Sequence, residues 1–209
     1  LLSARLLKAG ANDFLTRPFL EEELSVRVNQ NVDLLELLRN AEEIARRDPL
    51  TGLHNRRYLD EFAPTLKEAA QRSEQPLAAV VVDLDRFKKI NDEAGHFAGD
   101  AVLRAVAERL KETVRGADLL VRSGGEEFYI VCIGLDEEGA AVLGERLRHA
   151  VETVKVDHHG VELAVAASIG VASEHGVAVE HLLDAADRAM YCAKRAGRNR
   201  VVRASECED

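Results

Sequence analysis

The sequence has 209 residues, a formal net charge of −9 at pH 7, 46% hydrophobic residues and 31% charged residues. This composition is typical of a globular protein, and the length allows one domain and a piece of another. The acidic charge without a basic stripe argues against duplex DNA binding, and no apolar run approaches the roughly 20 residues that a membrane span needs.

The three cysteines, Cys132, Cys192 and Cys207, form no Cys-x-x-Cys motif, and their number is odd. This argues against a secreted disulfide framework and a zinc ribbon, and it favours free thiols in a reducing compartment. The chain starts at Leu1 and carries no signal peptide, so we expect a cytoplasmic fragment of a longer protein.

The first 20 residues are predicted to form a helix, a short strand and a loop. The helix covers residues 1–8 and stops at Gly10, and the strand covers residues 13–16. A break is expected at Arg17, because Pro18 forces the residue before it out of the α region.

Residues 21–47 contain neither glycine nor proline and are predicted to form a long linker helix. Three glutamates begin it and two arginines end it, as the helix dipole favours. One stripe follows a heptad spacing with two polar interruptions: Leu24, Val28, Asn31, Leu35, Leu38, Glu42 and Ala45. The stripe favours a dimer-forming coiled coil, and the alternative is an ordinary amphipathic helix on a neighbouring domain.

Residues 48–209 are predicted to form one α/β unit, a central sheet covered by helices. The predicted elements are a buried strand at 77–84, a helix at 102–110, a hairpin of strands 119–122 and 128–133, a helix at 140–154, a strand at 163–171 and a helix at 181–195. His158 and His159 are interpreted as a solvated turn before Gly160 rather than a metal site.

Two acidic motifs fall at the ends of predicted strands. Asp83 and Asp85 end the buried strand, and residues i and i+2 of a strand point to the same face. Glu126 and Glu127 follow the two turn glycines, Gly124 and Gly125. Each motif alone also fits solvated carboxylates, but neighbouring strands lie about 4.8 Å apart, so together they predict a shared magnesium site.

Lys194 and Arg198 lie four residues apart, on one face at the end of the last helix. A cationic helix end is favoured by the dipole alone. The same pair also suits a triphosphate, with a fork-shaped arginine beside a point-charge lysine.

Five motifs in order resemble the GGDEF family of diguanylate cyclases over residues 48–203. They are DPLTGLHNRR at 48–57, DLDRFKKIND at 83–92, the pairs GH at 95–96 and GD at 99–100, GGEEF at 124–128, and AKRAGRN at 193–199. The resemblance implies a central, mostly antiparallel sheet flanked by helices, similar to the palm of class III nucleotide cyclases.

The family's functional residues carry over onto matching positions. The resemblance implies that Asp83, Glu126 and the Leu84 carbonyl hold Mg²⁺ (or Mn²⁺), with Asp85 and Glu127 in or beside that shell. The remaining implied roles are guanine reading by Asn91 and Asp100, phosphate contacts by the backbone around Arg86, Phe87 and Lys88 and by Lys194 and Arg198, and a signature turn at Gly124 and Gly125. Glu127 is a candidate general base.

The implied reaction condenses two GTP molecules into cyclic di-GMP and pyrophosphate, with one GTP on each subunit of a homodimer. Arg115 and Asp118 resemble the family's inhibitory product site, and Arg146 matches a secondary arginine of that site. Without the family resemblance, such an Arg-x-x-Asp sequence would be interpreted as an ordinary surface ion pair.

Residues 9–19 resemble the end of a response-regulator receiver domain, with Arg17 where a lysine is usual. We therefore divide the chain into a receiver fragment at 1–20, the linker helix at 21–47 and the cyclase domain at 48–209. Two alternatives remain at this point: a non-catalytic module that binds GTP or cyclic di-GMP, and a scaffold whose GGDEF unit only dimerises.

Overall fold

The computed structural model describes the chain except residues 1–4, 6–7, 12, 16–17 and 208–209. It divides into two compact units, Leu1–Ala45 and Arg46–Asp209.

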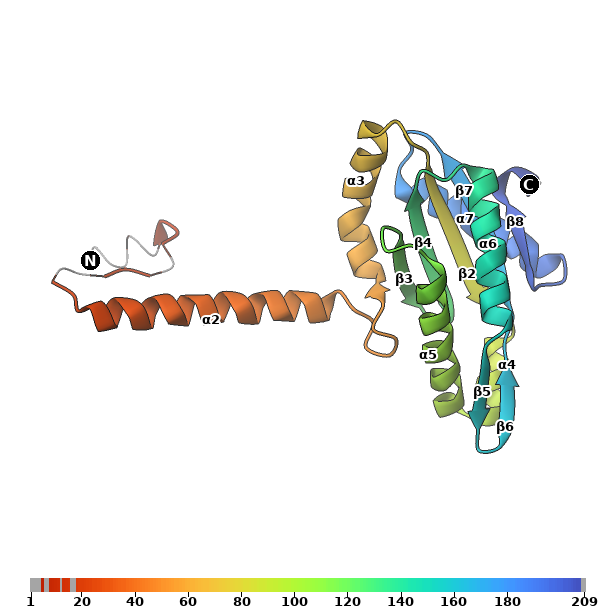
Figure 1. Ribbon diagram of the computed structural model, residues 1–209, viewed down its shortest axis with the longest axis horizontal. Coiled ribbons are helices and arrows are strands. Elements are labelled where there is room, and N and C mark those ends of the chain that lie inside the picture. The colour runs from red at the N-terminus through yellow and green to blue at the C-terminus, as the bar shows by residue number, and fades with distance from the viewer. Residues whose placement is uncertain (1–4, 6–7, 12, 16–17, 208–209) are drawn as a thin grey trace. The chain divides into compact units, whose positions relative to one another are not determined.

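The first unit consists mainly of helix α2, Glu21–Ala45 (Figure 1). Arg27 on this helix donates to both carboxylate oxygens of Asp13, at 2.8 and 3.0 Å. No residue of α2 is buried, and its large apolar side chains are between 40% and 76% exposed. The helix thus presents exposed apolar surface within the described part of its unit.

Only some of the predictions for the first 20 residues fall on residues that the structure describes. Most of the helix expected at 1–8 lies outside the described residues, although Arg5 and Lys8 are helical. Residues 13–15 form no strand, and Thr16 is not described. A strand is stabilised by hydrogen bonds to a neighbour, and no described segment pairs with these residues.

The second unit is built on a six-stranded sheet of order β1-β3-β4-β2-β7-β8. The central pairs are antiparallel, and the outer pairs β1–β3 and β7–β8 are parallel, which confirms the predicted mostly antiparallel sheet. The strands are β1 (His54–Asn55), β2 (Leu77–Leu84), β3 (Leu119–Gly124), β4 (Glu127–Ile133), β7 (Ala167–Glu174) and β8 (Arg200–Arg203). A separate hairpin pairs β5 (Lys155–His158) with β6 (Val161–Ala164), and His159 and Gly160 form its turn. The turn predicted at His158 and His159 is therefore confirmed for His159, whereas His158 is the last residue of β5.

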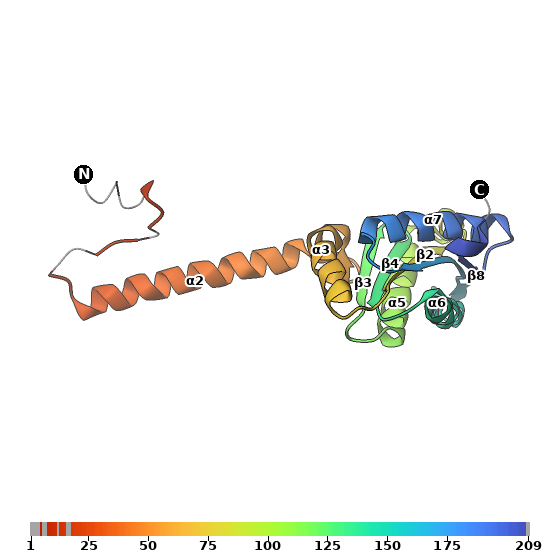
Figure 2. The ribbon, with the colours of Figure 1, turned by 90° about the horizontal axis from the view of Figure 1, so that it is seen from above.

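Helices cover both faces of this sheet (Figure 2). The core of one face includes residues of α5 (His96–Thr113) and α6 (Glu137–Glu152), and that of the other includes residues of α3 (Arg56–Arg72) and α7 (Val179–Arg195). The short helix α4 (Phe87–Ala94) follows β2, and the 3₁₀ helix η1 (Ala204–Glu206) follows β8.

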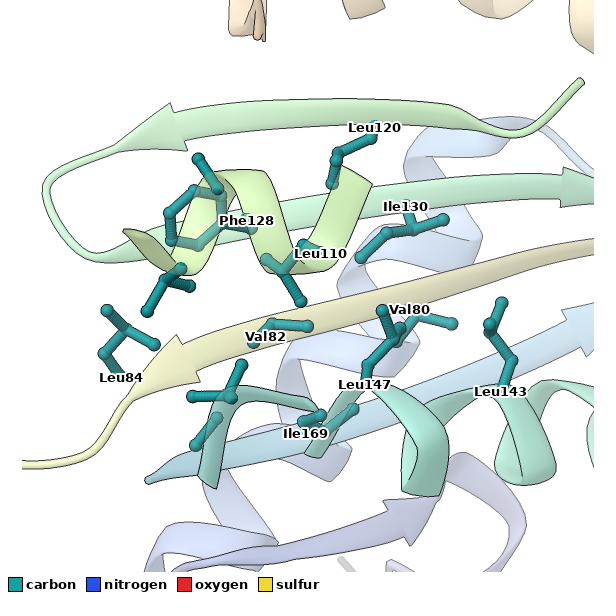
Figure 3. Packing of buried hydrophobic residues seen from close by; sticks show 14 of the residues in the cluster. Val80, Val82, Leu84, Leu110, Leu120, Phe128, Ile130, Leu143, Leu147 and Ile169 are labelled. Atoms are coloured by element: carbon teal, nitrogen blue, oxygen red, sulfur yellow. The ribbon is translucent and has the colours of Figure 1, made fainter. Parts of the chain in front are cut away.

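Strand β2 is buried at every position, and its side chains alternate between two cores. Val80, Val82 and Leu84 pack on the side of α5 and α6, where Figure 3 shows them beside Leu110 and Leu147. Ala79 and Val81 enter the core formed with α3 and α7. By the same alternation, Asp83 belongs to the α3 and α7 side of the sheet.

A glycine fixes the distance between α7 and the sheet. A Cβ at Gly170 on β7 would meet the backbone of Ala186 and Met190 on α7, inside contact distance. The helix therefore packs directly on the strand, and this close packing sets where its last turn ends.

Two expectations are corrected by the fold. The single strand predicted at 163–171 is wrong, because β6 ends at Ala164 to pair with β5 and β7 starts at Ala167 in the central sheet. The free thiols predicted at Cys192 and Cys207 are also wrong. The chain returns along α7 after β8, so these two cysteines form a disulfide, while Cys132 is free and buried.

Among the described residues, no helix combines the length and the hydropathy that a membrane crossing requires.

Candidate functional site

Acidic residues of β2 and of the β3–β4 hairpin meet at one end of the sheet. Asp83 lies directly opposite Glu127 in the β2–β4 register, and the Leu84 N–H donates to the Glu126 carbonyl at 3.3 Å. Gly125 at φ +52° adopts the left-handed conformation that this tight hairpin turn requires. The structure therefore brings Asp83, Glu126 and Glu127 together, as the sequence predicts.

Burial controls the electrostatics of this acidic end. Asp83 is only 4% exposed, and its Oδ2 lies 2.7 Å from the Nζ of Lys194 at the end of α7. Burial raises the pKa of Asp83 to about 6; Lys194 opposes the shift, and Glu126 and Glu127 add to it. Burial also raises the pKa of Glu127, with a further contribution from Asp187. The site thus holds more negative charge than Lys194 alone balances.

The donor set fits a magnesium ion that keeps part of its shell for water or phosphate. Within a strand the N–H and C=O of one residue point to the same side, so the Leu84 carbonyl faces Glu126. Two carboxylates and a carbonyl suit Mg²⁺, which usually takes few protein ligands. Among the described residues, no group of three or more His, Cys, Asp or Glu side chains is placed to hold a metal ion. The site is therefore suited to a metal shared with a phosphate ligand.

Asp85 lies apart from this donor set, although it follows Asp83 by only two residues. Its Oδ1 accepts from the Ser168 hydroxyl at 2.6 Å, and its Oδ2 accepts from the Asn199 N–H at 2.9 Å. Both carboxylate oxygens are thus engaged within the protein.

Helices α4 and α5 bring together the residues expected to read guanine. Asn91 lies on α4 and Asp100 on α5, and both are partly exposed. Gly99 lies directly beneath the Asn91 side chain, since a Cβ there would collide with Asn91 Oδ1 and press on the Phe87 ring. The lack of a side chain at Gly99 therefore lets Asn91 lie against α5, one residue from Asp100.

The expected phosphate contacts lie at the start of α4, at the end of α7 and in the loop after α7. The single helical face predicted for Lys194 and Arg198 is wrong, because α7 ends at Arg195 and Arg198 has φ +67°. Arg86 precedes α4 with φ +56°, and the first-turn N–H groups of Phe87 and Lys88 give that helix an anion-attracting end. The Phe87 side chain is buried, so only its backbone is available there, and Lys88 is exposed. Arg198 is 45% exposed, and its Nε lies 4.0 Å from Asp85 Oδ1.

The expected product-site residues line one surface hollow of about 240 Å³. Arg115, Asp118 and Arg146 surround it together with residues of α6. Asp118 accepts from the Arg115 backbone N–H at 2.9 Å, so the backbone closes this turn. Arg146 donates to the Thr113 carbonyl at 3.0 Å.

Sequence reasoning missed Arg122, which connects the start of the second unit to the signature turn. Its Nη1 donates to both carboxylate oxygens of Asp48, at 2.9 and 3.1 Å. Its Nε and Nη2 donate to the Gly125 carbonyl, at 3.1 and 2.7 Å. An arginine two residues before the glycine pair was the only signal in the sequence, and its partners are distant in the chain.

Comparisons with known proteins place this geometry in a family. The family model described as "Diguanylate cyclase, GGDEF domain" matches residues 45–200. The response regulator PleD of Caulobacter vibrioides is 42% identical over an alignment 209 residues long. The alignment covers 95% of this chain and 46% of PleD. The chain thus spans less than half the length of that curated relative.

Two solved structures of DgcB from Caulobacter crescentus, both in complex with c-di-GMP, are similar to the chain. The coiled coil with the GGDEF domain has a TM-score of 0.81 and 28% identity, and the match covers 88% of this chain and 98% of that one. The GGDEF domain by itself has a TM-score of 0.73 and 30% identity, with coverage of 77% and 96%.

Proposed function

The chain belongs to the GGDEF diguanylate cyclase family, and on this premise we propose that it condenses two GTP molecules into cyclic di-GMP and pyrophosphate. The observation that carries the proposal is the meeting of Asp83, Glu126 and Lys194 at one end of the sheet, with Asn91 and Asp100 on the two helices that follow β2. The GGEEF form of the signature retains both carboxylates, which supports catalysis over a purely binding role.

In the proposed reaction, the 3′-hydroxyl of one GTP attacks the α-phosphate of the other. A bond from O3′ to phosphorus forms, the bond between α- and β-phosphates breaks, and pyrophosphate leaves; a second such step closes the ring. Asn91 and Asp100 orient each guanine through its hydrogen-bonding edge. Lys194 and Arg198 hold the phosphates, so that positioning supplies much of the rate.

Glu127 is the proposed acceptor of the 3′-hydroxyl proton. Its raised pKa makes it a stronger base than an exposed glutamate, and it lies opposite Asp83 in the register.

A divalent metal fits the proposal, with Asp83, Glu126 and the Leu84 carbonyl as its protein ligands and Mg²⁺ or Mn²⁺ as the candidates. When bound, it would offset the negative charge that develops on the transferred phosphate. Lys194 already pairs with Asp83 and supplies part of the balancing positive charge at the same place.

The proposed catalyst is a homodimer, because one domain offers one guanine site and the reaction needs two GTP molecules. The apolar stripe of α2 supports pairing with a second copy of this chain.

The receiver assignment for residues 1–20 stays part of the proposal. It is supported by the PleD match, which extends beyond the residues that the GGDEF model covers. A cytoplasmic location and the lack of a DNA-binding role stay predictions.

The direct test incubates the purified chain with GTP and Mg²⁺, or with Mn²⁺, and separates the products by chromatography. Cyclic di-GMP and pyrophosphate are the expected products. GTP that binds and is recovered unchanged with either metal would favour a nucleotide-binding module.

Guanine recognition gives a prediction at Gly99. Gly99→Ala is expected to push the Asn91 side chain off α5, because the new Cβ would collide with Asn91 Oδ1. The affinity for GTP should fall by about tenfold or more, since a displaced amide leaves hydrogen bonds of the base unmade. Calorimetry with GTP and ATP measures the change, and unchanged discrimination between them would contradict the assignment of Asn91.

Product inhibition gives a prediction at Arg115. Arg115→Ala is expected to weaken inhibition by cyclic di-GMP by about tenfold while the initial rate stays near that of the parent, because a charge-assisted hydrogen bond is lost away from the acidic site. Initial rates at increasing product concentrations provide the measurement, with Arg109→Ala as a control from an exposed pair on α5. Unchanged inhibition would return Arg115 and Asp118 to the role of a surface turn.

A further inference from the structure

The loop after α7 carries Arg198 in an unfavourable backbone conformation. Gly197, Arg198 and Asn199 have φ values of +115°, +67° and +44° in succession. A residue such as Arg198 adopts a left-handed angle only at an energetic cost, so the surrounding structure must hold the loop there.

Asn199 supplies the bonds that hold this loop. Its backbone N–H donates to Asp85 Oδ2 at 2.9 Å. Its side-chain oxygen accepts from Arg148 at 2.9 Å, and its amide nitrogen donates to Glu152 at 2.8 Å. One residue thereby connects the loop to the end of β2 and to helix α6.

Both anchors of Asn199 are themselves fixed. The Asp85 side chain is only 6% exposed and accepts a second bond from Ser168, which is fully buried on β7. On α6, Arg148 donates to Glu152 at 3.0 Å and to Glu145 at 2.9 Å. The hydrogen bond from Asn199 is the largest cause that holds the pKa of Glu152 below its usual range. The network therefore joins two strands and a helix around the loop.

The loop opens on a hollow suited to phosphate. Arg86, Lys89 and Arg198 line this hollow of about 670 Å³, together with Asp85, Glu152 and Asn199. Its two other acids are paired, Glu93 with Lys89 and Glu162 with Lys155. Asp85, Glu152 and Asn199 engage one another or neighbouring residues through the bonds above, whereas Arg198 approaches Asp85 no closer than 4.0 Å. A fork-shaped guanidinium directed by a rigid loop is suited to a terminal phosphate.

We propose that Asp85, Ser168, Asn199, Glu152 and Arg148 form a clamp that positions Arg198 for the triphosphate of the substrate. Asp85 is accordingly a positioning residue of this clamp and not a metal ligand. This inference rests on the proposed function, in which Arg198 holds phosphate. It predicts that loss of the clamp weakens triphosphate binding and leaves guanine recognition unchanged.

The test uses Asn199→Asp in the full chain, with Mg²⁺ present. Aspartate keeps the size and tolerates the left-handed angle, but it places a carboxylate against Glu152. Affinity for inorganic tripolyphosphate and KM for GTP should each worsen by about tenfold, with kcat and guanosine affinity nearly unchanged, as expected when only ground-state binding is lost.

Paired variants make the test specific. Asn199→Asp combined with Glu152→Gln exchanges donor and acceptor across the same bond, so it should recover most of the affinity. Ser168→Ala, a smaller change, should lower tripolyphosphate affinity in the same direction. Glu112→Gln removes an exposed ion pair on α5 and serves as the matched control, with no expected effect.

The outcomes separate the clamp from the proposed function. A parent chain that binds tripolyphosphate but makes no cyclic di-GMP refutes the proposed function, and the affinities still test the clamp. The clamp is overturned if Asn199→Asp binds tripolyphosphate as the parent does, if guanosine affinity falls equally, if the double variant fails to recover, or if the parent does not bind tripolyphosphate.

Discussion

Asp83→Asn or Glu126→Gln is expected to lower the rate of cyclic di-GMP formation by at least about a hundredfold, the scale seen when one electrostatic contact to a transition state is lost. The two carboxylates meet where the end of β2 lies beside the β3–β4 turn, and each substitution removes one of the proposed metal ligands while keeping its shape. Initial rates at saturating GTP and a range of Mg²⁺ concentrations measure the loss. Asp60→Asn, from an exposed ion pair on α3, is the control and should retain the parent rate.

The loss of rate should not come from unfolding. The pKa of Asp83 is raised to about 6 by burial, so its charged form costs stability. This cost in folding free energy is absent below the pKa of Asp83 in the unfolded chain. It grows as the pH rises from that pKa to about 6, and it is fully present above about pH 6. Asp83→Asn removes this cost, so it should stabilise the metal-free chain at pH 8, measured as a higher midpoint of urea denaturation. If Asp83→Asn kept near-parent turnover, the proposal that Asp83 is a metal ligand would be wrong.

The parts of the fold that the sequence predicts best are those with strong local patterns. The apolar run at 77–84 and the helical spacing before Lys194 correspond to β2 and α7. The run at 163–171 was misread, because neither glycine nor proline marks Val165 and Ala166, where the chain leaves one sheet for the other. Local pattern carries no information about which partner strand a residue meets.

The residues of the candidate site also differ in how far local sequence patterns predict them. The sequence could place Asp83, Glu126 and Glu127 at one end of the sheet because each lies at the end of a strand or at a turn that the sequence reveals. The contacts of Arg122, Ser168 and Asn199 span 74, 83 and 114 residues of the chain, so no local signal predicts them. The partners of Asp85 likewise could not be predicted from its spacing to Asp83, since they come from β7 and the loop after α7. The Cys192–Cys207 disulfide likewise depends on the return of the chain past α7.

Removal of residues 1–45 is expected to make turnover depend on protein concentration. The second unit has two hydrophobic cores of its own, and a similar GGDEF domain forms a solved structure by itself, so residues 46–209 should remain folded. If α2 pairs two copies, it holds their active sites at an effective concentration of about millimolar. At micromolar protein the shortened chain should therefore lose at least about a hundredfold in rate per molecule and recover it as its concentration rises.

Substitutions on α2 distinguish pairing from a mere loss of length. Leu35→Lys and Leu38→Lys place charges on the heptad stripe, and in the full chain they should reproduce the concentration dependence of the shortened one. Asn40→Lys adds the same charge two positions beyond Leu38, off the stripe, and should leave the rate per molecule unchanged. Light scattering on the same samples reports the oligomeric state. A dimer is expected for the full chain, because the apolar side chains of α2 are 40% to 76% exposed and a second copy would cover them. If the shortened chain turned over at a constant rate per molecule across all concentrations, α2 would have no part in bringing two GTP-loaded domains together, and the contact would have to lie within residues 46–209.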